Sequence, residues 1–211
     1  MVETRNSSME KSADASREFV DAGTEIRLLR QAKKMTLQDL AKRSKRSPGH
    51  LSQIERGAIE PSLAVLHSIA NALGVEVGFF FPAEAGANDK EKQVVVRSRT
   101  RRRLSRTYSY DTAEIGFEDF LLSADLSLDL CMGLARISPG GSTNPDRKTN
   151  ETHQCGYVLS GQVLLHLEDQ QFLLRQGDSF SFDGRRSHVI RNETDSMAEI
   201  IWCTSPTRLD Y

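Results

Sequence analysis

The hydrophobic pattern of this sequence changes between its first and second parts. From residue 17 to residue 81, apolar residues recur at helical spacing in short segments that glycines and prolines interrupt. Beyond Asp111, apolar and polar residues alternate in runs such as CMGLARI and GYVLSGQVLLHLE, with glycines between the runs. The two periodicities indicate a small helical domain followed by an all-β domain.

Length and composition agree with two folded domains. The chain has 211 residues, of which 38% are hydrophobic and 27% are charged. No apolar run approaches the roughly 18 residues that a membrane helix requires, and the N-terminus lacks the apolar segment of a secretory signal. We therefore predict a cytoplasmic protein that makes no membrane contact.

The cysteines do not form a recognisable ligand or disulfide pattern. Cys131, Cys155 and Cys203 are odd in number and share no CxxC or Cys/His spacing. Neither a disulfide framework nor a zinc finger is indicated, so we predict free thiols.

The charges are distributed unevenly, although the formal net charge is only -1. Residues 17–81 carry an excess of Lys and Arg, residues 90–106 hold eight basic residues against the single acid Glu91, and the part beyond Asp111 is acidic. We divide the chain into a disordered arm (1–16), a helical domain (17–82), a linker with a basic hinge or first strand (83–106) and a β domain (107–211).

Two short helices are predicted near the middle of the helical domain. Thr36 and Asp39 have the spacing of a capping box, which places a helix start near Thr36. A second helix is expected near Ser47, because its hydroxyl can cap the helix and Pro48 at the first helical position loses no hydrogen bond.

The second helix is expected to expose short polar groups. Leu51 and Ile54 lie three residues apart and face inward. The outward surface of this helix is therefore formed by Ser47, Gly49, His50, Ser52 and Gln53. Basic residues surround it at Lys42, Arg43, Lys45, Arg46 and Arg56. This combination suits insertion into a DNA major groove between flanking phosphates.

The run HLSQIERGAIEPSLAVLHSIANALGV, within about 55 residues that begin at IRLLRQ, resembles the Cro and lambda-repressor type (XRE family) of helix-turn-helix domain. The resemblance implies a five-helix domain that binds double-stranded operator DNA. It further implies DNA contacts by Gln38, Arg46, Ser47, Gly49, His50, Ser52, Gln53 and Arg56, the two arginines at the backbone. The alternative is a helix bundle that binds protein.

Two residues depart from the expected interface. Lys45 stands in the turn where the family usually has glycine at a position of positive φ. Glu55 is an acid among bases, and we interpret it as a structural partner of Arg30 or of a helix terminus.

The β domain resembles the cupin family. The resemblance lies in YVLSGQV from Tyr157, GDSFSF from Gly177 and HVIRN from His188, and it covers about 80 residues. It implies a double-stranded β-helix, or jelly-roll, barrel, so the predicted fold class is a two-domain α plus all-β protein.

The positions that hold metal in metal-binding cupins are mostly altered. They fall on Lys148, Asn150, Gln154 and His188, of which only the last is a usual ligand. An ammonium group and two neutral amides do not suit a transition metal, so we predict neither a metal nor another cofactor. His153 lies one residue away and is expected on the opposite strand face, at the rim.

Without a metal, the interior of the barrel offers a pocket lined by donors. We predict that it binds a small acidic or amide-bearing effector. Its lining is Lys148, Asn150, Gln154, Phe180, Phe182 and His188. A packed barrel that serves only for dimerisation is the alternative.

The order of the two domains resembles that of bacterial transcription regulators whose cupin barrel senses a metabolite. The resemblance implies a homodimer on a near-palindromic operator. We predict no catalytic residues. The alternatives are a mononuclear-metal cupin oxidase with a helix-turn-helix-like domain, which would need the missing ligands, and a scaffold that senses nothing.

Overall fold

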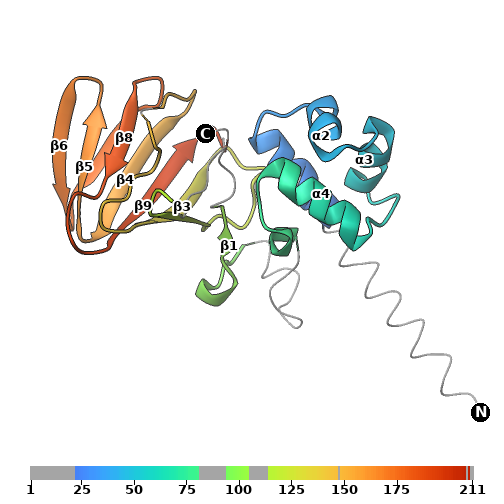
Figure 1. The fold of residues 1–211 in the computed structure, drawn as a ribbon, viewed down its shortest axis with the longest axis horizontal. Coiled ribbons are helices and arrows are strands. Elements are labelled where there is room, and N and C mark those ends of the chain that lie inside the picture. Colours follow the sequence, from blue (N-terminus) through green and yellow to red (C-terminus); the bar gives the residue numbers. More distant parts are fainter. Residues whose placement is uncertain (1–21, 81–93, 105–113, 147, 208, 210–211) are drawn as a thin grey trace, which may run out of the picture. The chain divides into compact units, whose positions relative to one another are not determined.

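The computed structural model describes residues 22–80, 94–104, 114–146, 148–207 and 209 (Figure 1). The chain divides into two compact units, Met1–Ala85 and Gly86–Tyr211. The predicted arm and the predicted boundaries after residues 16, 82 and 106 lie outside the described residues.

The helical unit contains four α-helices among its described residues. They are residues 22–32, α2 (Leu37–Ser44), α3 (Pro48–Glu55) and α4 (Leu63–Leu73). A 3-10 helix, η1 (Val77–Phe80), follows. The predicted five helices are thus four α-helices and one 3-10 turn within the described part, because the four residues of η1 are too few for an α-helix of normal length. No helix in this part of the chain is long and apolar enough to cross a bilayer.

Local hydrogen bonds start these helices where the sequence predicts. The Thr36 hydroxyl accepts from the backbone N–H of Asp39 at 3.1 Å, and the Asp39 carboxylate accepts from the Thr36 N–H at 2.9 Å, which confirms the capping box. Ser47 accepts from the N–H of His50 at 3.2 Å, and Pro48 occupies the first turn of α3.

The helical core takes large side chains from every α-helix. Gly23 marks the closest approach, because a Cβ there would lie 2.3 Å from the carbonyl oxygen of Ile54 at the end of α3. The first helix therefore packs directly against the end of α3. The side chains that are almost fully buried include Ile26, Leu29, Leu40, Leu51, Ile54, Leu66, Ile69 and Leu73.

The β unit is built from two antiparallel sheets. The larger has the order β1-β2-β3-β9-β4-β7 and the smaller has the order β6-β5-β8. The strands are β1 (Arg102–Arg103), β2 (Phe117–Leu121), β3 (Cys131–Ile137), β4 (His153–Ser160), β5 (Gln162–Leu167), β6 (Gln170–Arg175), β7 (Ser179–Asp183), β8 (His188–Arg191) and β9 (Ala198–Ser205). A 3-10 turn, η2 (Ser98–Thr100), precedes β1.

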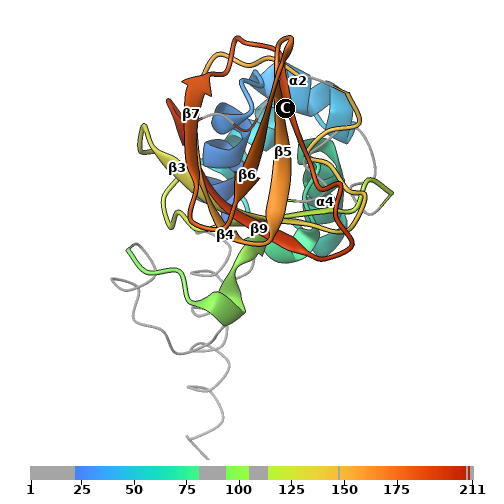
Figure 2. The same cartoon turned by 90° about the vertical axis from the view of Figure 1, so that its left-hand side faces the viewer.

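The core of the β unit lies between the two sheets. Figures 1 and 2 show β5, β6 and β8 facing the larger sheet. Buried residues alternate with less buried ones along β2 and β5, and the buried residues of the two sheets form one cluster. The cluster includes Ile137, Val158, Val163, Leu165, Phe182, Ile190 and Ile200.

Aromatic rings fill part of the space between the sheets. A Cβ on Gly133 would lie 2.2 Å from the ring of Trp202, and a Cβ on Gly156 would lie 2.4 Å from the ring of Phe180. Trp202 is fixed further, because its indole N–H donates to Asp119 at 2.8 Å. These two glycines make room for the rings on the neighbouring strands.

Candidate nucleic-acid interface and ligand site

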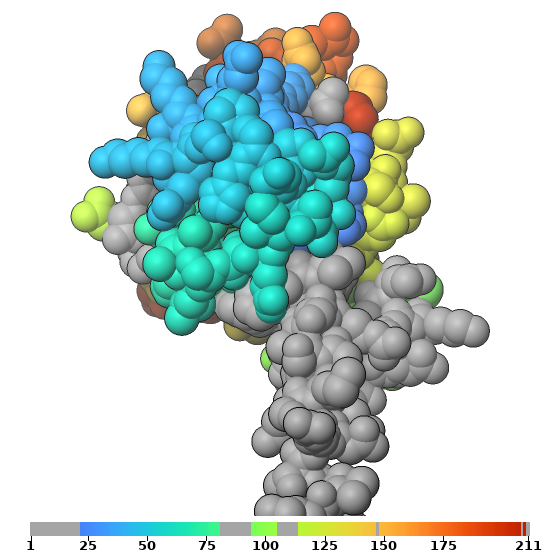
Figure 3. All heavy atoms as spheres, turned by 90° about the vertical axis from the view of Figure 1, so that its right-hand side faces the viewer, coloured from blue at the N-terminus to red at the C-terminus, as the bar shows by residue number. Residues whose placement is uncertain are grey.

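The recognition face of α3 is exposed and polar. Leu51 and Ile54 are buried, as predicted, whereas Gln53 is exposed and His50 and Ser52 are half-buried. A Cβ on Gly49 would meet no atom within 4 Å, so a partner can approach the α3 backbone closely here. The side chains of α2, α3 and α4 form the face turned toward the viewer in Figure 3.

The two predicted backbone-contacting arginines are held by nearby oxygens. The Nε of Arg46 donates to the hydroxyl of Ser68 on α4 at 3.2 Å, and the Nε of Arg56 donates to the carbonyl of Ser52 at 3.2 Å. Both bonds use Nε, so each guanidinium keeps further N–H groups for a phosphate. Gln38 lies exposed in the first turn of α2.

Lys45 adopts the backbone conformation that the family reserves for glycine. Its φ is 55° and its ψ is 42°, and its N–H donates to the carbonyl of Ala41 to close α2. The N–H of Arg46 reaches the same carbonyl at 3.0 Å. The turn between α2 and α3 therefore forms without a glycine, although a left-handed conformation costs a side-chain-bearing residue about 1 kcal/mol.

An ion pair fixes α3 to the rest of the helical unit. The Nε and Nη2 of Arg30 donate to the two carboxylate oxygens of Glu55 at 2.7 and 2.9 Å. The Nη1 of Arg30 also donates to the carbonyl of Met35 at 2.8 Å. This confirms the prediction that Glu55 pairs with Arg30, and the hydrogen bond to Glu55 raises the pKa of Arg30. The pair positions the end of α3 rather than contacting a partner.

His188 is the buried polar centre of the β unit. Its Nδ1 donates to the carbonyl of Arg186 at 2.8 Å, because a carbonyl can only accept. In the neutral ring, Nε2 then accepts from the amide of Gln154, and the two nitrogens are 3.3 Å apart. The ring also lies 4.7 Å from that of Phe182 between centroids. Burial lowers the pKa of His188.

These contacts do not suit a metal. The lone pair that would ligate an ion is already bonded to the Gln154 amide, and the other two ligand positions hold Lys148 and Asn150. Among the described residues, no group of three or more His, Cys, Asp and Glu side chains could hold a metal ion. The donor set of this chain therefore disagrees with that of a metal-binding cupin, and we derive no metal chemistry from it.

Of the other predicted pocket residues, Lys148 and Phe180 lie beside His188 and Phe182, whereas Asn150 makes local hydrogen bonds. Lys148 forms an isolated antiparallel bridge with His188, which places the two side chains on the same side. Phe180 stacks on Phe182 with ring centroids 5.9 Å apart. Asn150 differs, since its carbonyl oxygen accepts from the N–H and hydroxyl of Thr152 at 3.2 and 2.6 Å and thereby closes a local turn.

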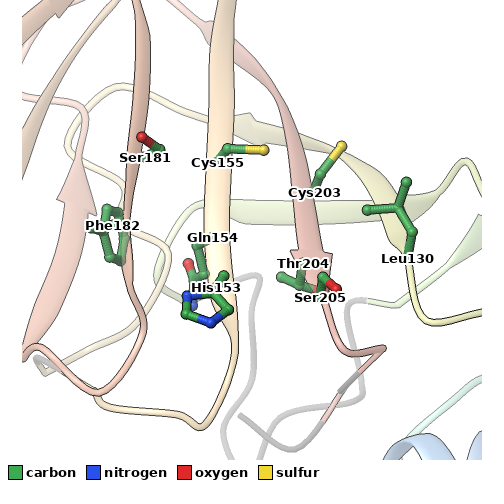
Figure 4. Close-up of a pocket in the computed structure, with 9 residues that line it drawn as sticks. All are labelled: Leu130, His153, Gln154, Cys155, Ser181, Phe182, Cys203, Thr204 and Ser205. Atoms are coloured by element: carbon green, nitrogen blue, oxygen red, sulfur yellow. The ribbon is translucent and has the colours of Figure 1, made fainter.

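Two grooves lie on the β unit, and both are lined by two cysteines that the sequence analysis did not assign to a site. One has a volume of about 330 Å³ and the other about 420 Å³, and Cys155 and Cys203 line both. Gln154 and Phe182 also line the first groove, and Phe180 lines the second. The other three predicted pocket residues line neither. Figure 4 shows the first groove and its lining side chains.

Thr204 is a further polar group at the first groove. Its side chain is 3% exposed, and its hydroxyl has no hydrogen-bond partner among the described residues. It is paired across strands with Gln154. The buried hydroxyl is therefore available to a ligand, and no local sequence pattern marks it.

The buried neutral imidazole predicts that acid destabilises the β unit. The unfolded chain has a His pKa of about 6.5, above that of folded His188, so below about pH 6.5 the unfolded state binds more protons and stability falls as the pH decreases. Urea unfolding followed by fluorescence of Trp202, the single tryptophan, measures this at about pH 7.5 and about pH 5.5.

His188→Gln should shrink the difference in unfolding free energy between the two pH values. His153→Gln, at an exposed histidine on β4, is the matched control and should retain it. An equal acid loss in wild type and His188→Gln would contradict this assignment.

Comparison with known proteins identifies both units. Residues 26–80 match the family described as Helix-turn-helix, and residues 133–204 match the family described as Cupin domain. The HTH-type transcriptional regulator PuuR of Escherichia coli (strain K12) is 23% identical over 196 residues, which cover 91% of this chain and 98% of PuuR.

Two further similarities cover different parts of the chain. The uncharacterized HTH-type transcriptional regulator y4dL of Sinorhizobium fredii is 43% identical over 53 residues, which cover 25% of this chain and only 27% of y4dL. The crystal structure of an HTH_3 family transcriptional regulator from Vibrio cholerae aligns over 90% of this chain and 98% of its own, with a TM-score of 0.42 and 19% identity.

The chain is therefore a helix-turn-helix protein with a second, cupin domain. The two domains stand in the order that the resemblance predicts, with the helix-turn-helix domain before the cupin domain.

Proposed function

We propose that this protein is a transcriptional regulator that binds operator DNA as a homodimer and responds to a small metabolite held by its cupin domain. The observation that carries the DNA-binding part is the exposed polar face of α3, from Ser47 to Gln53, presented on a helix whose apolar residues are buried. PuuR, an HTH-type transcriptional regulator that aligns with nearly the whole chain, supports the regulatory role.

The dimensions of α3 suit the major groove. An α-helix with its side chains is about 10–12 Å across, and the major groove of B-DNA is about 12 Å wide. Gln53 is placed to pair with an adenine through its amide, and the open surface at Gly49 admits close approach of the backbone. Arg46 and Arg56 would hold phosphates at either end of α3.

A homodimer would present two copies of α3 to two half-sites. In a two-fold symmetric dimer, the two α3 helices would meet half-sites about 34 Å apart on a near-palindromic site. This distance is one turn of the double helix. The operator sequence would then mirror the symmetry of the protein.

The effector part of the proposal rests on polar groups that meet near one end of the cupin domain. Gln154 lies between the buried imidazole of His188 and the unpartnered hydroxyl of Thr204. Lys148 is bridged to His188 and adds a positive charge on the same side. A small acid or amide matches a cation, an amide and a hydroxyl in an apolar surrounding.

Selection of bound DNA by the purified chain tests the DNA-binding function. We expect a near-palindromic consensus, and Gln53→Ala should weaken binding to it by about 10- to 100-fold, since a bidentate base contact contributes about 1–3 kcal/mol. Asn71→Ala, an exposed amide on α4, is the matched control and should bind as the wild type does. Binding without sequence preference by a folded protein would contradict the proposal.

A thermal-shift panel of small carboxylic acids and amides tests the effector part. A compound that binds with a concentration of about 100 times its Kd adds about 2.7 kcal/mol of stability and so raises the Tm. Lys148→Met should abolish the shift caused by an acid, whereas Arg175→Met, at an exposed position of β6, should leave it unchanged. No shift from any compound would count against effector binding and leave the DNA-binding proposal intact.

A further inference from the structure

Two cysteines face each other on adjacent strands of the larger sheet. Cys155 on β4 and Cys203 on β9 are direct partners in the antiparallel register. Their neighbours Gln154 and Thr204 face inward, so both thiols point to the outer face of the sheet. Figure 4 shows the Cys155 side chain directed toward the strand that carries Cys203.

The two thiols interact, and they differ in accessibility. Cys155 is exposed and Cys203 is half-buried. Burial raises the pKa of Cys203, and the neighbouring Cys155 thiol raises it further. Both side chains line the two grooves, so a small molecule in solution can reach them.

The backbone geometry at this pair allows a covalent bond. Residues directly opposite in an antiparallel pair have Cα atoms about 4.5–5.5 Å apart. A disulfide requires about 4.4–6.8 Å between its Cα atoms, so the usual spacing of directly paired strands suits a bond between Cys155 and Cys203.

The third cysteine provides an internal contrast. Cys131 is 0% exposed on the inner side of β3, and burial raises its pKa to about 12. Thiolates are the reactive form, so Cys131 is inert to oxidants that react with exposed thiols.

The geometry points to a modification site: Cys155 and Cys203 form an intramolecular disulfide when the protein meets a hydroperoxide. Formation of this disulfide requires neither the proposed DNA binding nor the proposed effector binding, although Gln154 and Thr204 line the first groove together with the two thiols. The two thiols lie on the outer face of the larger sheet, and both of them line the two grooves.

The oxidation proceeds in two balanced steps. The thiolate of Cys155 attacks one peroxide oxygen, the O–O bond breaks, an alcohol or water leaves with a proton, and Cys155 becomes a sulfenic acid. The thiolate of Cys203 then attacks that sulfur, the S–O bond breaks, the S–S bond forms, and hydroxide leaves as water with the proton from Cys203. The two sulfurs together lose two electrons to the peroxide.

The difference in exposure decides which thiol reacts with the peroxide first. Cys155 is exposed and reaches the peroxide first, whereas the less accessible Cys203 resolves the intermediate. The raised pKa of Cys203 agrees with this order, because it lowers the thiolate fraction available for the first attack.

The test is oxidation of the full chain with hydrogen peroxide, followed by intact mass and peptide mapping. We expect the mass to fall by two hydrogen atoms, a cross-link between the peptides of Cys155 and Cys203, and reversal by dithiothreitol. Cys131 should become alkylated only after unfolding. A cross-link that contains Cys131, a link between two chains, or oxidation of Cys155 to a sulfinic acid without any cross-link would each overturn the proposal.

Single variants separate the two roles. Cys203→Ser should stop at the Cys155 sulfenic acid, which dimedone traps, and Cys155→Ser should leave Cys203 reduced over the same time. Cys131→Ser should still form the disulfide as the wild type does. Fluorescence of Trp202 checks that each variant is folded. A sulfenic acid on Cys203 in the wild type would overturn the assigned order.

Discussion

Replacing Glu55 with alanine is expected to lower the free energy of unfolding of the helical unit by about 3 kcal/mol. The side chains of Arg30 and Glu55 are only 13% and 7% exposed. Without Glu55, the Arg30 guanidinium stays largely buried and loses both of its charge-assisted hydrogen bonds to the carboxylate. Removing one member of a buried pair costs more than the pair contributes, because the remaining charge is left without a counterion.

Urea unfolding of the full chain, followed by far-UV circular dichroism, measures this loss. The helical signal comes from the helical unit, whereas Trp202 fluorescence reports the β unit and should be unaffected. Glu60→Ala, an exposed acid of the same unit, is the control and should change stability by less than about 0.5 kcal/mol. A Glu55→Ala loss as small as that of the control would show that the pair does not anchor α3.

Removing the ring of Trp202 is expected to destabilise the β unit by about 3 kcal/mol or more. The ring fills the space above Gly133, where a Cβ would lie 2.2 Å from it, and its N–H donates to the buried Asp119 at 2.8 Å. Trp202→Ala therefore opens a cavity between the sheets and takes a donor from a carboxylate that is 1% exposed.

Trp202→Phe separates these two contributions. Phenylalanine keeps a smaller ring near Gly133 and removes the hydrogen bond to Asp119, so we expect a smaller loss than for alanine, of about 1 kcal/mol. Calorimetry of the full chain measures both variants, since neither retains the tryptophan. Equal losses for the two variants would contradict the role of the ring in filling the interior.

The start of each central helix was predictable because capping is local. Thr36 bonds Asp39 three residues on, Ser47 bonds the N–H three residues on, and Pro48 is favourable at the first helical position whatever the tertiary fold. The left-handed Lys45 follows from its place between two such helices. Interactions within one turn of a helix can be read from the spacing of residues.

The candidate ligand site was only partly predictable. Counting residues from the cupin motifs brought Gln154 and His188 together, and the structure shows their contact. The same count placed Asn150 in the pocket, but its carbonyl oxygen closes a turn with Thr152. A loop position is fixed by nearby hydrogen bonds that motif spacing does not encode.

Two features depended entirely on the tertiary structure. The pairing of Cys155 with Cys203 requires the register of β4 on β9, and the filling of the interior by Trp202 requires Gly133 on the neighbouring strand. Strand register joins residues far apart in the chain, and shifting it by one residue reverses every side chain.

The sequence by itself determined the two kinds of domain, the helix starts, the structural role of Glu55 and the alternation that turns Gln154 inward and His153 outward, and the structure decided that Arg30 is the partner of Glu55. These follow from periodicity and local hydrogen bonding, which act over a few residues, or from family motifs. Only the tertiary structure decided which side chains meet across strands, where the grooves lie and which buried polar groups lack a partner. Those properties arise from pairing and packing between segments that the chain order leaves open.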